Sequence, residues 1–148
     1  MPFQNILGKS IDELSVGERA YFAKTISETD ICQFASVTCD FNPAHVNEAY
    51  ASNTFFKQRI AHGMLTVSLV SNVLGTQLPG PGTIFVSESV QFLAPVFIQD
   101  TIEVVVEVVE LDREKNRMKF KAWRVNQNEV KVLTAEGVVM PPKKRKAA

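Results

Sequence analysis

The stretch IAHGMLTVSLVSNVLGTQL, residues 60–78, decides how this chain folds. Its apolar residues occupy most of the circumference of a helix, and its polar residues are mostly small serines and threonines. A helix that is apolar nearly all round lies inside a protein, where every face is covered. The run LPGPG at 78–82 then ends it, because proline and glycine rarely continue a helix. These residues predict a long buried helix over 62–77, around which the rest of the chain packs.

Beyond this helix the spacing of apolar residues changes to alternation, the pattern of a β-strand with one buried face. The alternating segments are 83–93, 102–108, 118–122 and 129–140. Ala94-Pro95 interrupts the chain after the first of them and leaves room for a short extension. Polar turns at 112–117 and 126–128 separate the other three, which we therefore expect to form an antiparallel meander.

The residues before the buried helix predict one more strand and two helices. Residues 18–26 carry aromatics and indicate a strand, whereas 28–39 have helical spacing behind an acidic first turn. Asn42-Pro43 suits a helix start and predicts a short helix to about residue 52. The fold class is therefore α+β, with an antiparallel sheet wrapped around a long central helix. A chain of 148 residues forms one domain, which we assign to 1–140.

The remaining residues, 141–148, form a basic segment that we expect to be a disordered tail. Its charged residues are Lys143, Lys144, Arg145 and Lys146. In composition it also resembles a nuclear-localisation cluster. A third interpretation is that its positive charges bind the phosphates of a ligand weakly. Since the whole chain has 16 basic and 16 acidic residues, the rest carries 12 basic against 16 acidic. An acidic body argues against nucleic acid as a partner.

Cysteine usage and hydropathy suggest the compartment. Cys32 and Cys39 fit neither a metal motif nor a disulfide framework, so we expect reduced thiols and a cytoplasmic protein. Residues 1–10 lack the basic start and apolar run of a signal peptide. No apolar run approaches the roughly 18 residues that span a membrane, so no membrane partner is expected.

Asp40, Asn42 and His45 lie within six residues of one another in the stretch CDFNPAHVNEAYA at 39–51. Each alone is explained as part of a helix start. Together, an acid and an imidazole held by a proline-stiffened turn can work on one water, one group taking a proton while the other delivers one. Burial of the pair would shift both pKa values towards those that suit groups exchanging protons with a substrate. We take Asp40 and His45 as the candidate acid–base pair.

A second candidate feature is Ala61-His62-Gly63-Met64, where the buried helix begins. First-turn amides have no acceptor within the helix, and glycine lets a ligand oxygen approach the backbone closely. An amide aimed at a carbonyl that gains negative charge forms an oxyanion hole. Alternatively, Gly63 only relieves crowding at the helix start, and the sequence favours neither reading.

The combination of DFNPAH at 40–45 with IAHGML at 60–65 resembles the MaoC-like (R)-specific enoyl-CoA hydratases of the hotdog superfamily. The stretches LPGPGTIF and VQFLAPVFIQDTIEVVVEV resemble the same family, and the likeness covers roughly 18–140. It implies a single hotdog of five or six antiparallel strands around the 62–77 helix. It also implies a homodimer, since family members cover a sheet edge and face by dimerising.

The resemblance further implies the reaction and its residues. Asp40 and His45 would activate a water that adds reversibly across a trans-2-enoyl-CoA thioester, giving the (R)-3-hydroxyacyl-CoA. The Gly63 amide would polarise the thioester carbonyl, with a supporting hydrogen bond from Ser71. Asn42 would hold the loop, and His62 would mainly build the helix start. Which member of the pair protonates the α-carbon stays open.

No cofactor or metal is expected, because no second histidine or carboxylate lies at ligand spacing in the sequence. Many relatives have glycine where this chain has Cys39. A nucleophilic role for that thiol is one reading, but nothing basic is placed to activate it, so we interpret Cys39 as a small residue at a helix end.

The sequence also leaves three rival functions open. A dehydratase acting on a carrier-protein or CoA thioester would use the same residues in reverse. A thioesterase would need a carboxylate aimed at the thioester carbon, which the Asp-x-Asn-Pro-x-His order disfavours. A non-catalytic acyl-thioester-binding subunit would dispense with the acid–base pair, and both members are present. For the hydratase itself, the resemblance suggests a supply of polyhydroxyalkanoate precursors.

Overall fold

The computed structural model describes residues 4–144. The elements, in chain order, are the 3-10 turns η1 (Gln4–Ile6) and η2 (Ile11–Glu13), then β1 (Arg19–Thr25), α1 (Glu28–Thr38), α2 (Pro43–Val46), α3 (Glu48–Ala51), α4 (Gly63–Ser68), α5 (Val70–Thr76), β2 (Ile84–Phe92), β3 (Thr101–Asp112), β4 (Arg117–Val125) and β5 (Lys131–Met140).

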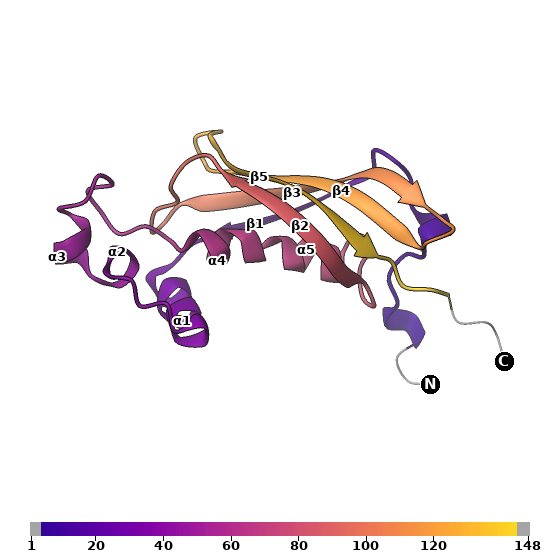
Figure 1. The fold of residues 1–148 in the computed structure, drawn as a ribbon, viewed down its shortest axis with the longest axis horizontal. Helices are drawn as coiled ribbons and strands as arrows, with labels where there is room; N and C mark the ends of the chain where they lie inside the picture. The colour runs from indigo at the N-terminus through magenta and orange to yellow at the C-terminus, as the bar shows by residue number, and fades with distance from the viewer. Residues whose placement is uncertain (1–3, 145–148) are drawn as a thin grey trace.

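The strands form one five-stranded antiparallel sheet in the order β1-β3-β4-β5-β2. The predicted meander, β3-β4-β5, is confirmed. In Figure 1 the helices α4 and α5 run along one face of this sheet, while α1, α2 and α3 gather beyond one end. The extension that we allowed after Ala94-Pro95 is only an isolated bridge between Ile60 and Phe97. The architecture is therefore the predicted α+β arrangement.

The core fills the space between α4–α5 and the sheet, and alternation along the strands builds it. Its buried members on the three central strands include Val104, Val106, Val108, Met118, Phe120, Ala122, Leu133, Ala135 and Val139. Leu65, Val67, Val70, Val73 and Leu74 cover them from the helical side. Because side chains alternate between the faces of a strand, the charged residues between the core positions fall on the outer face.

The central helix differs from the prediction in two ways. It is interrupted at Leu69, although that residue keeps helical angles of φ −61° and ψ −24°. It is also buried on one side only, because Gly63, Met64 and Ser71 are exposed. The apolar pattern therefore overestimates how much of this helix a single chain covers.

The predicted helix over 28–39 is confirmed as α1, whose start is capped by Ser27 and Asp30. The predicted short helix to residue 52 is instead two one-turn helices. They part at Asn47, which leaves the helical region and caps α3 by accepting a hydrogen bond from the Tyr50 amide at 3.0 Å. The cap at Asn42 is confirmed, since its Oδ1 accepts from the Ala44 amide at 3.1 Å.

The expected tail begins in contact with the domain. Pro141 and Pro142 are buried, and Asn116 Nδ2 donates a 2.9 Å hydrogen bond to the Pro141 carbonyl. Lys144 pairs with Glu13 at 3.0 Å. The part of the expected tail at 145–148 lies outside the described residues. None of the helices described is both long and apolar enough to pass through a bilayer.

Candidate active site

The loop from Cys39 to Asn42 follows α1 directly and is held by hydrogen bonds from its backbone amides to nearby side-chain oxygens. Cys39 ends the helix in the left-handed region, at φ 60°. The Asp40 amide donates to Thr38 Oγ1 at 3.2 Å, and the Asn42 amide donates to Asp40 Oδ1 at 3.1 Å. Because Asn42 also caps α2, it fixes the carboxylate and the helix that carries His45 relative to each other.

His45 is 8% exposed and its ring orientation is fixed by a backbone carbonyl. Its Nδ1 lies 2.7 Å from the oxygen of Ile60. A carbonyl only accepts hydrogen bonds, so Nδ1 carries the proton and donates it. In the neutral ring Nε2 is therefore the nitrogen with a free lone pair.

His62 lies directly against this histidine. The two rings stack with centroids 3.9 Å apart, and Phe34 covers His62 at 4.9 Å. His62 stands at the N-cap position of α4, but its side chain does not cap the helix. Instead Nε2 donates to the Asp40 carbonyl at 3.0 Å. His62, which is 2% exposed, thus ties the start of α4 to the Asp40 loop.

Asp40, His45 and His62 offer nitrogen and oxygen atoms that all lie within 4.8 Å of one another. This corrects the expectation that no second histidine comes near. A water hydrogen-bonded to two groups bridges a gap of about 5 Å, so the Asp40 carboxylate and a ring nitrogen of His45 lie close enough to share one. As a metal site the group is poor, because His62 Nε2 is already donating to Asp40. The arrangement suits a shared water better than an ion.

Gly63 stands at the edge of an apolar cleft of about 340 Å³. The Gly63 backbone lies close to the cleft wall, since a Cβ added to it would be 2.8 Å from Phe92 Cε1. As the first residue of α4, Gly63 has an amide without an acceptor inside the helix. The other residues of the lining include Phe56, Ile60, Thr66, Leu93 and Leu133.

The sequence did not identify Phe56, Phe92 or Thr66 as parts of this cleft. Ser71, which it did identify, is an exposed residue of α5. Among the described residues we find no hydrogen bond between Ser71 and the Asp40–His45 pair. The structure thus brings Asp40, Asn42, His45 and His62 together, with Gly63 following His62 directly.

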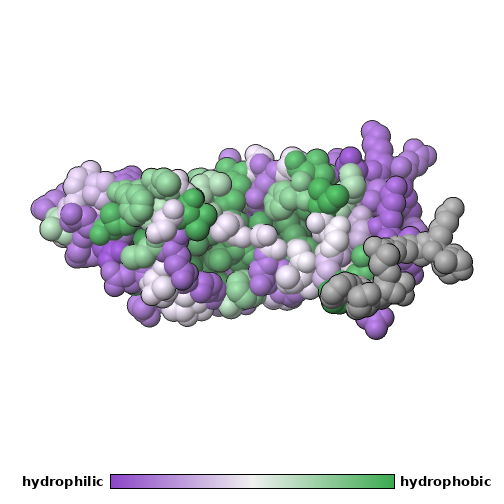
Figure 2. Space-filling model, turned by 90° about the horizontal axis from the view of Figure 1, so that it is seen from below, coloured by the Kyte–Doolittle hydropathy of each residue, from purple (hydrophilic) through white to green (hydrophobic). Residues whose placement is uncertain are grey.

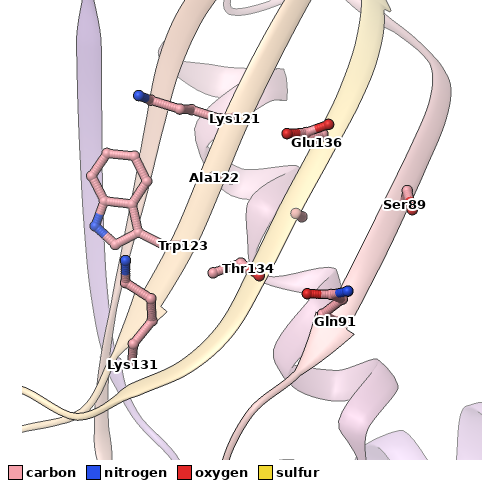
Figure 3. A pocket seen from close by; sticks show the side chains of 9 residues that line it. Ser89, Gln91, Lys121, Ala122, Trp123, Lys131, Thr134 and Glu136 are labelled. Carbon is pink, nitrogen blue, oxygen red and sulfur yellow. The ribbon is translucent and has the colours of Figure 1, made fainter.

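A larger groove of about 520 Å³ lies on the outer face of the sheet. Figure 3 shows its side chains in front of the strands, with the helices passing behind. Trp123 is its aromatic member, and the amino groups of Lys121 and Lys131 lie 6.0 and 5.8 Å from the ring centroid. None of the residues that line this groove belongs to the Asp40–His45 loop or to α4.

The fold and the site together define a class: a hotdog protein with an Asp/His pair beside the start of its central helix. The family described as MaoC like domain matches residues 14–131. The chain therefore belongs to the MaoC-like family of the hotdog superfamily. Both the family resemblance and the single hotdog fold predicted from the sequence are confirmed.

Individual relatives are similar in sequence to this protein over nearly the whole chain. The (R)-specific enoyl-CoA hydratase of Rhodospirillum rubrum is 49% identical over 131 residues, 88% of this chain and 90% of that protein. The 3-hydroxybutyryl-CoA dehydratase of Methylorubrum extorquens is 45% identical over 136 residues, 92% and 86% of the two chains. The unliganded R-hydratase PhaJ1 from Pseudomonas aeruginosa superposes with a TM-score of 0.88 at 39% identity, covering 95% of this chain and 92% of its own.

Proposed function

We propose that this protein catalyses the reversible, (R)-specific hydration of trans-2-enoyl-CoA to (R)-3-hydroxyacyl-CoA. The observation that carries the proposal is the spacing of Asp40 and His45, which offer ligand atoms within 4.8 Å of one another and of His62. Gly63, the residue after His62, lines an apolar cleft. Relatives named for the two directions of the reaction, a hydratase and a 3-hydroxybutyryl-CoA dehydratase, support it.

The proton chemistry follows from the fixed histidine tautomer. The Asp40 carboxylate and His45 Nε2 hold one water, and Nε2 has the lone pair that accepts a proton. In the forward direction an O–H bond of the water breaks, the hydroxyl adds to C3, and a proton is delivered to C2. Because both groups stand on one loop-and-helix unit, water approaches from one side and both atoms add to the same face. Dehydration reverses these transfers.

The thioester carbonyl gains negative charge as the hydroxyl adds, and the Gly63 amide is the group we assign to it. Ser71 supplies the supporting hydrogen bond from α5. Asn42 and His62 are positioning residues, since Asn42 holds the Asp40 carboxylate and His62 holds the Asp40 carbonyl. The cleft between Phe56 and Phe92 accommodates apolar parts of the substrate. No cofactor takes part in this scheme.

We further propose that the protein is a homodimer joined through β2. This strand lies at the edge of the sheet. Ile84, Phe85 and Val86 are 57%, 43% and 49% exposed, which is costly for a strand whose backbone edge is also unpaired. Figure 2 shows apolar surface along the middle of the face seen from below, between polar ends. A second copy would cover both the edge and part of the exposed side of α4 and α5.

The setting of the reaction is also a proposal. Free Cys32 and Cys39 suit the cytoplasm, where thiols stay reduced. The R-hydratase of Aeromonas caviae, 38% identical, is described as involved in polyhydroxyalkanoate biosynthesis, and we propose the same use for the product of this chain. CoA rather than a carrier protein is the proposed carrier, because the two most similar relatives described above are named for CoA thioesters.

The test is to incubate the purified full chain with crotonyl-CoA, follow the ultraviolet band of the enoyl thioester, and assign the chirality of the product. Loss of the band with formation of (R)-3-hydroxybutyryl-CoA is the expected result. An (S) product would contradict the stereochemistry. An enzyme inert towards C4, C6 and C8 enoyl-CoAs but active on carrier-protein thioesters would transfer the function to a carrier-protein dehydratase. Inertness towards all of them would indicate a binding subunit.

A further inference from the structure

The most deeply buried charge in the described chain is a residue that the proposed chemistry does not use. Arg124, on β4, has no exposed surface and is the largest of the fully buried side chains. Its partner is Glu88 on β2, with Nη2 and Oε1 3.6 Å apart. The carboxylate is nearly covered as well, since the Glu88 side chain is 10% exposed.

This pair is poorly satisfied. Within the described residues, Arg124 Nε and Nη1 and Glu88 Oε1 are buried without hydrogen-bond partners. Desolvation raises the pKa of Glu88 and lowers the pKa of Arg124, and their mutual attraction offsets only part of each shift. Because a buried pair of this kind adds little stability over apolar residues of similar size, folding alone does not account for it.

Among the described residues, the one hydrogen bond that the Arg124 side chain makes goes to the central helix. Nη2 donates to the Val67 carbonyl at 2.8 Å. Val67 lies four residues after Gly63 and four before Ser71, and the helix is interrupted two residues beyond it, at Leu69. Arg124 therefore holds the backbone midway between the two residues assigned to the thioester, two residues before the break between α4 and α5.

We propose that Arg124, held by Glu88, is a positioning residue that sets α4 relative to α5, and hence the Gly63 amide relative to Ser71. The inference rests on the proposed function of those two residues. A guanidinium can donate to Val67 and still face Glu88, because its donors form a rigid fork. In addition to core packing, the sheet thus holds the backbone between the carbonyl-binding groups through the Arg124 hydrogen bond.

The experiment replaces the pair by one of similar size without charge, Arg124→Met with Glu88→Met. The matched control is Arg19→Met with Glu107→Met, an Arg–Glu pair 3.1 Å apart on the outer face. Arg124→Lys is the conservative variant, since an ammonium can still donate to Val67. Each full-length protein is assayed with crotonyl-CoA for kcat and KM. The carbonyl stretch of bound butyryl-CoA, labelled with carbon-13 at the thioester, reports polarisation independently of the fraction folded.

We expect kcat of the Met pair to fall about tenfold or more at little-changed KM, because misplaced donors weaken the transition state. The carbonyl band of bound butyryl-CoA should move back towards its position in water. Arg124→Lys should recover part of both effects, and the outer-face control should match the wild type.

A folded Met pair with wild-type kcat and carbonyl band would overturn the positioning role. So would a fall in kcat that merely follows the folded fraction while the band stays unchanged. If the Met pair does not fold, Arg124→Gln with Glu88→Gln is judged by the same two readouts, since glutamine is too short to reach Val67. A wild-type protein that neither hydrates crotonyl-CoA nor shifts the band would instead refute the proposed function, and the inference with it.

Discussion

Cys39 occupies a backbone conformation that suits glycine. It follows α1 in the left-handed region, at φ 60°, where an L side chain crowds the next carbonyl. Glycine adopts this conformation without that crowding. The residue is exposed, so its side chain gains little by burial in return.

Cys39→Gly should therefore raise the free energy of unfolding by about 1 kcal/mol. The control is Cys32→Gly, because Cys32 is also exposed but lies inside α1, where glycine lowers stability by about 0.5 kcal/mol. Urea unfolding of the two variants measures both effects. Equal effects of the two substitutions would contradict the backbone argument.

Asp40 and His45 are the residues on which turnover should depend most. Asp40→Asn and His45→Gln should each lower kcat about a hundredfold or more with little loss of stability. The glutamine amide can still donate to the Ile60 carbonyl, so the fold at His45 is kept. Crotonyl-CoA turnover is the measurement, with Asp12→Asn, an exposed aspartate of η2, as the control. Full activity in either variant would remove that residue from the mechanism.

The sequence predicted the local half of the site better than the distant half. Asp40, Asn42 and His45 lie close in the chain, so turn chemistry alone brings them together. His62 contacts Asp40 across 22 residues, and the cleft wall at Phe92 comes from a strand beyond the central helix. Such contacts depend on how elements pack, which no local pattern records.

At the scale of elements, alternation located β3, β4 and β5 to within a few residues, because most of their buried side chains lie on one face. The helical elements were predicted less well. The break at Asn47 was missed since asparagine is compatible with both a helix interior and a cap. The interruption at Leu69 lies beside the bond from Arg124, a residue 57 positions from Val67, and no spacing within the helix indicates it.

Glu88 of β2 makes the free energy of unfolding depend on pH in the direction opposite to that of an ion-paired carboxylate with a lowered pKa. Desolvation raises the pKa of Glu88 above its ordinary 4.5, and Arg124 offsets only part of the shift. The folded protein therefore holds this proton more tightly than the unfolded chain does. As a result, the Glu88 contribution lowers the free energy of unfolding as pH rises through the folded-state pKa.

Relative to the wild type, Glu88→Gln should become more stable as pH rises from about 4 to 8, because it has no proton to lose. Glu107→Gln should instead become less stable relative to the wild type as pH rises through the range around and below 4.5, since hydrogen bonds from Lys121 and Arg19 lower the pKa of Glu107. Urea unfolding at several pH values measures both. A pH-independent difference for Glu88→Gln would show that its carboxyl group titrates alike in the folded and unfolded states.

At the scale of the whole molecule, the apolar surface of β2 should control assembly. Val86→Lys places a charge on this edge strand and should convert the proposed dimer into a monomer. Val109→Lys is the matched control, because Val109 of β3 is 45% exposed against 49% for Val86 and does not lie on an edge strand. Light scattering after gel filtration gives the mass of each variant. A dimer that survives in Val86→Lys would place the interface elsewhere.

The two edges of the sheet differ, and the difference limits how far copies can add to one another. β1, the other edge strand, carries Arg19 and Lys24, and both are ion-paired with neighbouring elements. Lysine and arginine on an edge discourage a further strand from joining. If the β2 edges of two copies pair about a two-fold axis, both β2 edges are covered, and only the charged β1 edges stay exposed to solvent. Assembly then stops at a closed pair, and fibre growth along the sheet has no free end from which to continue.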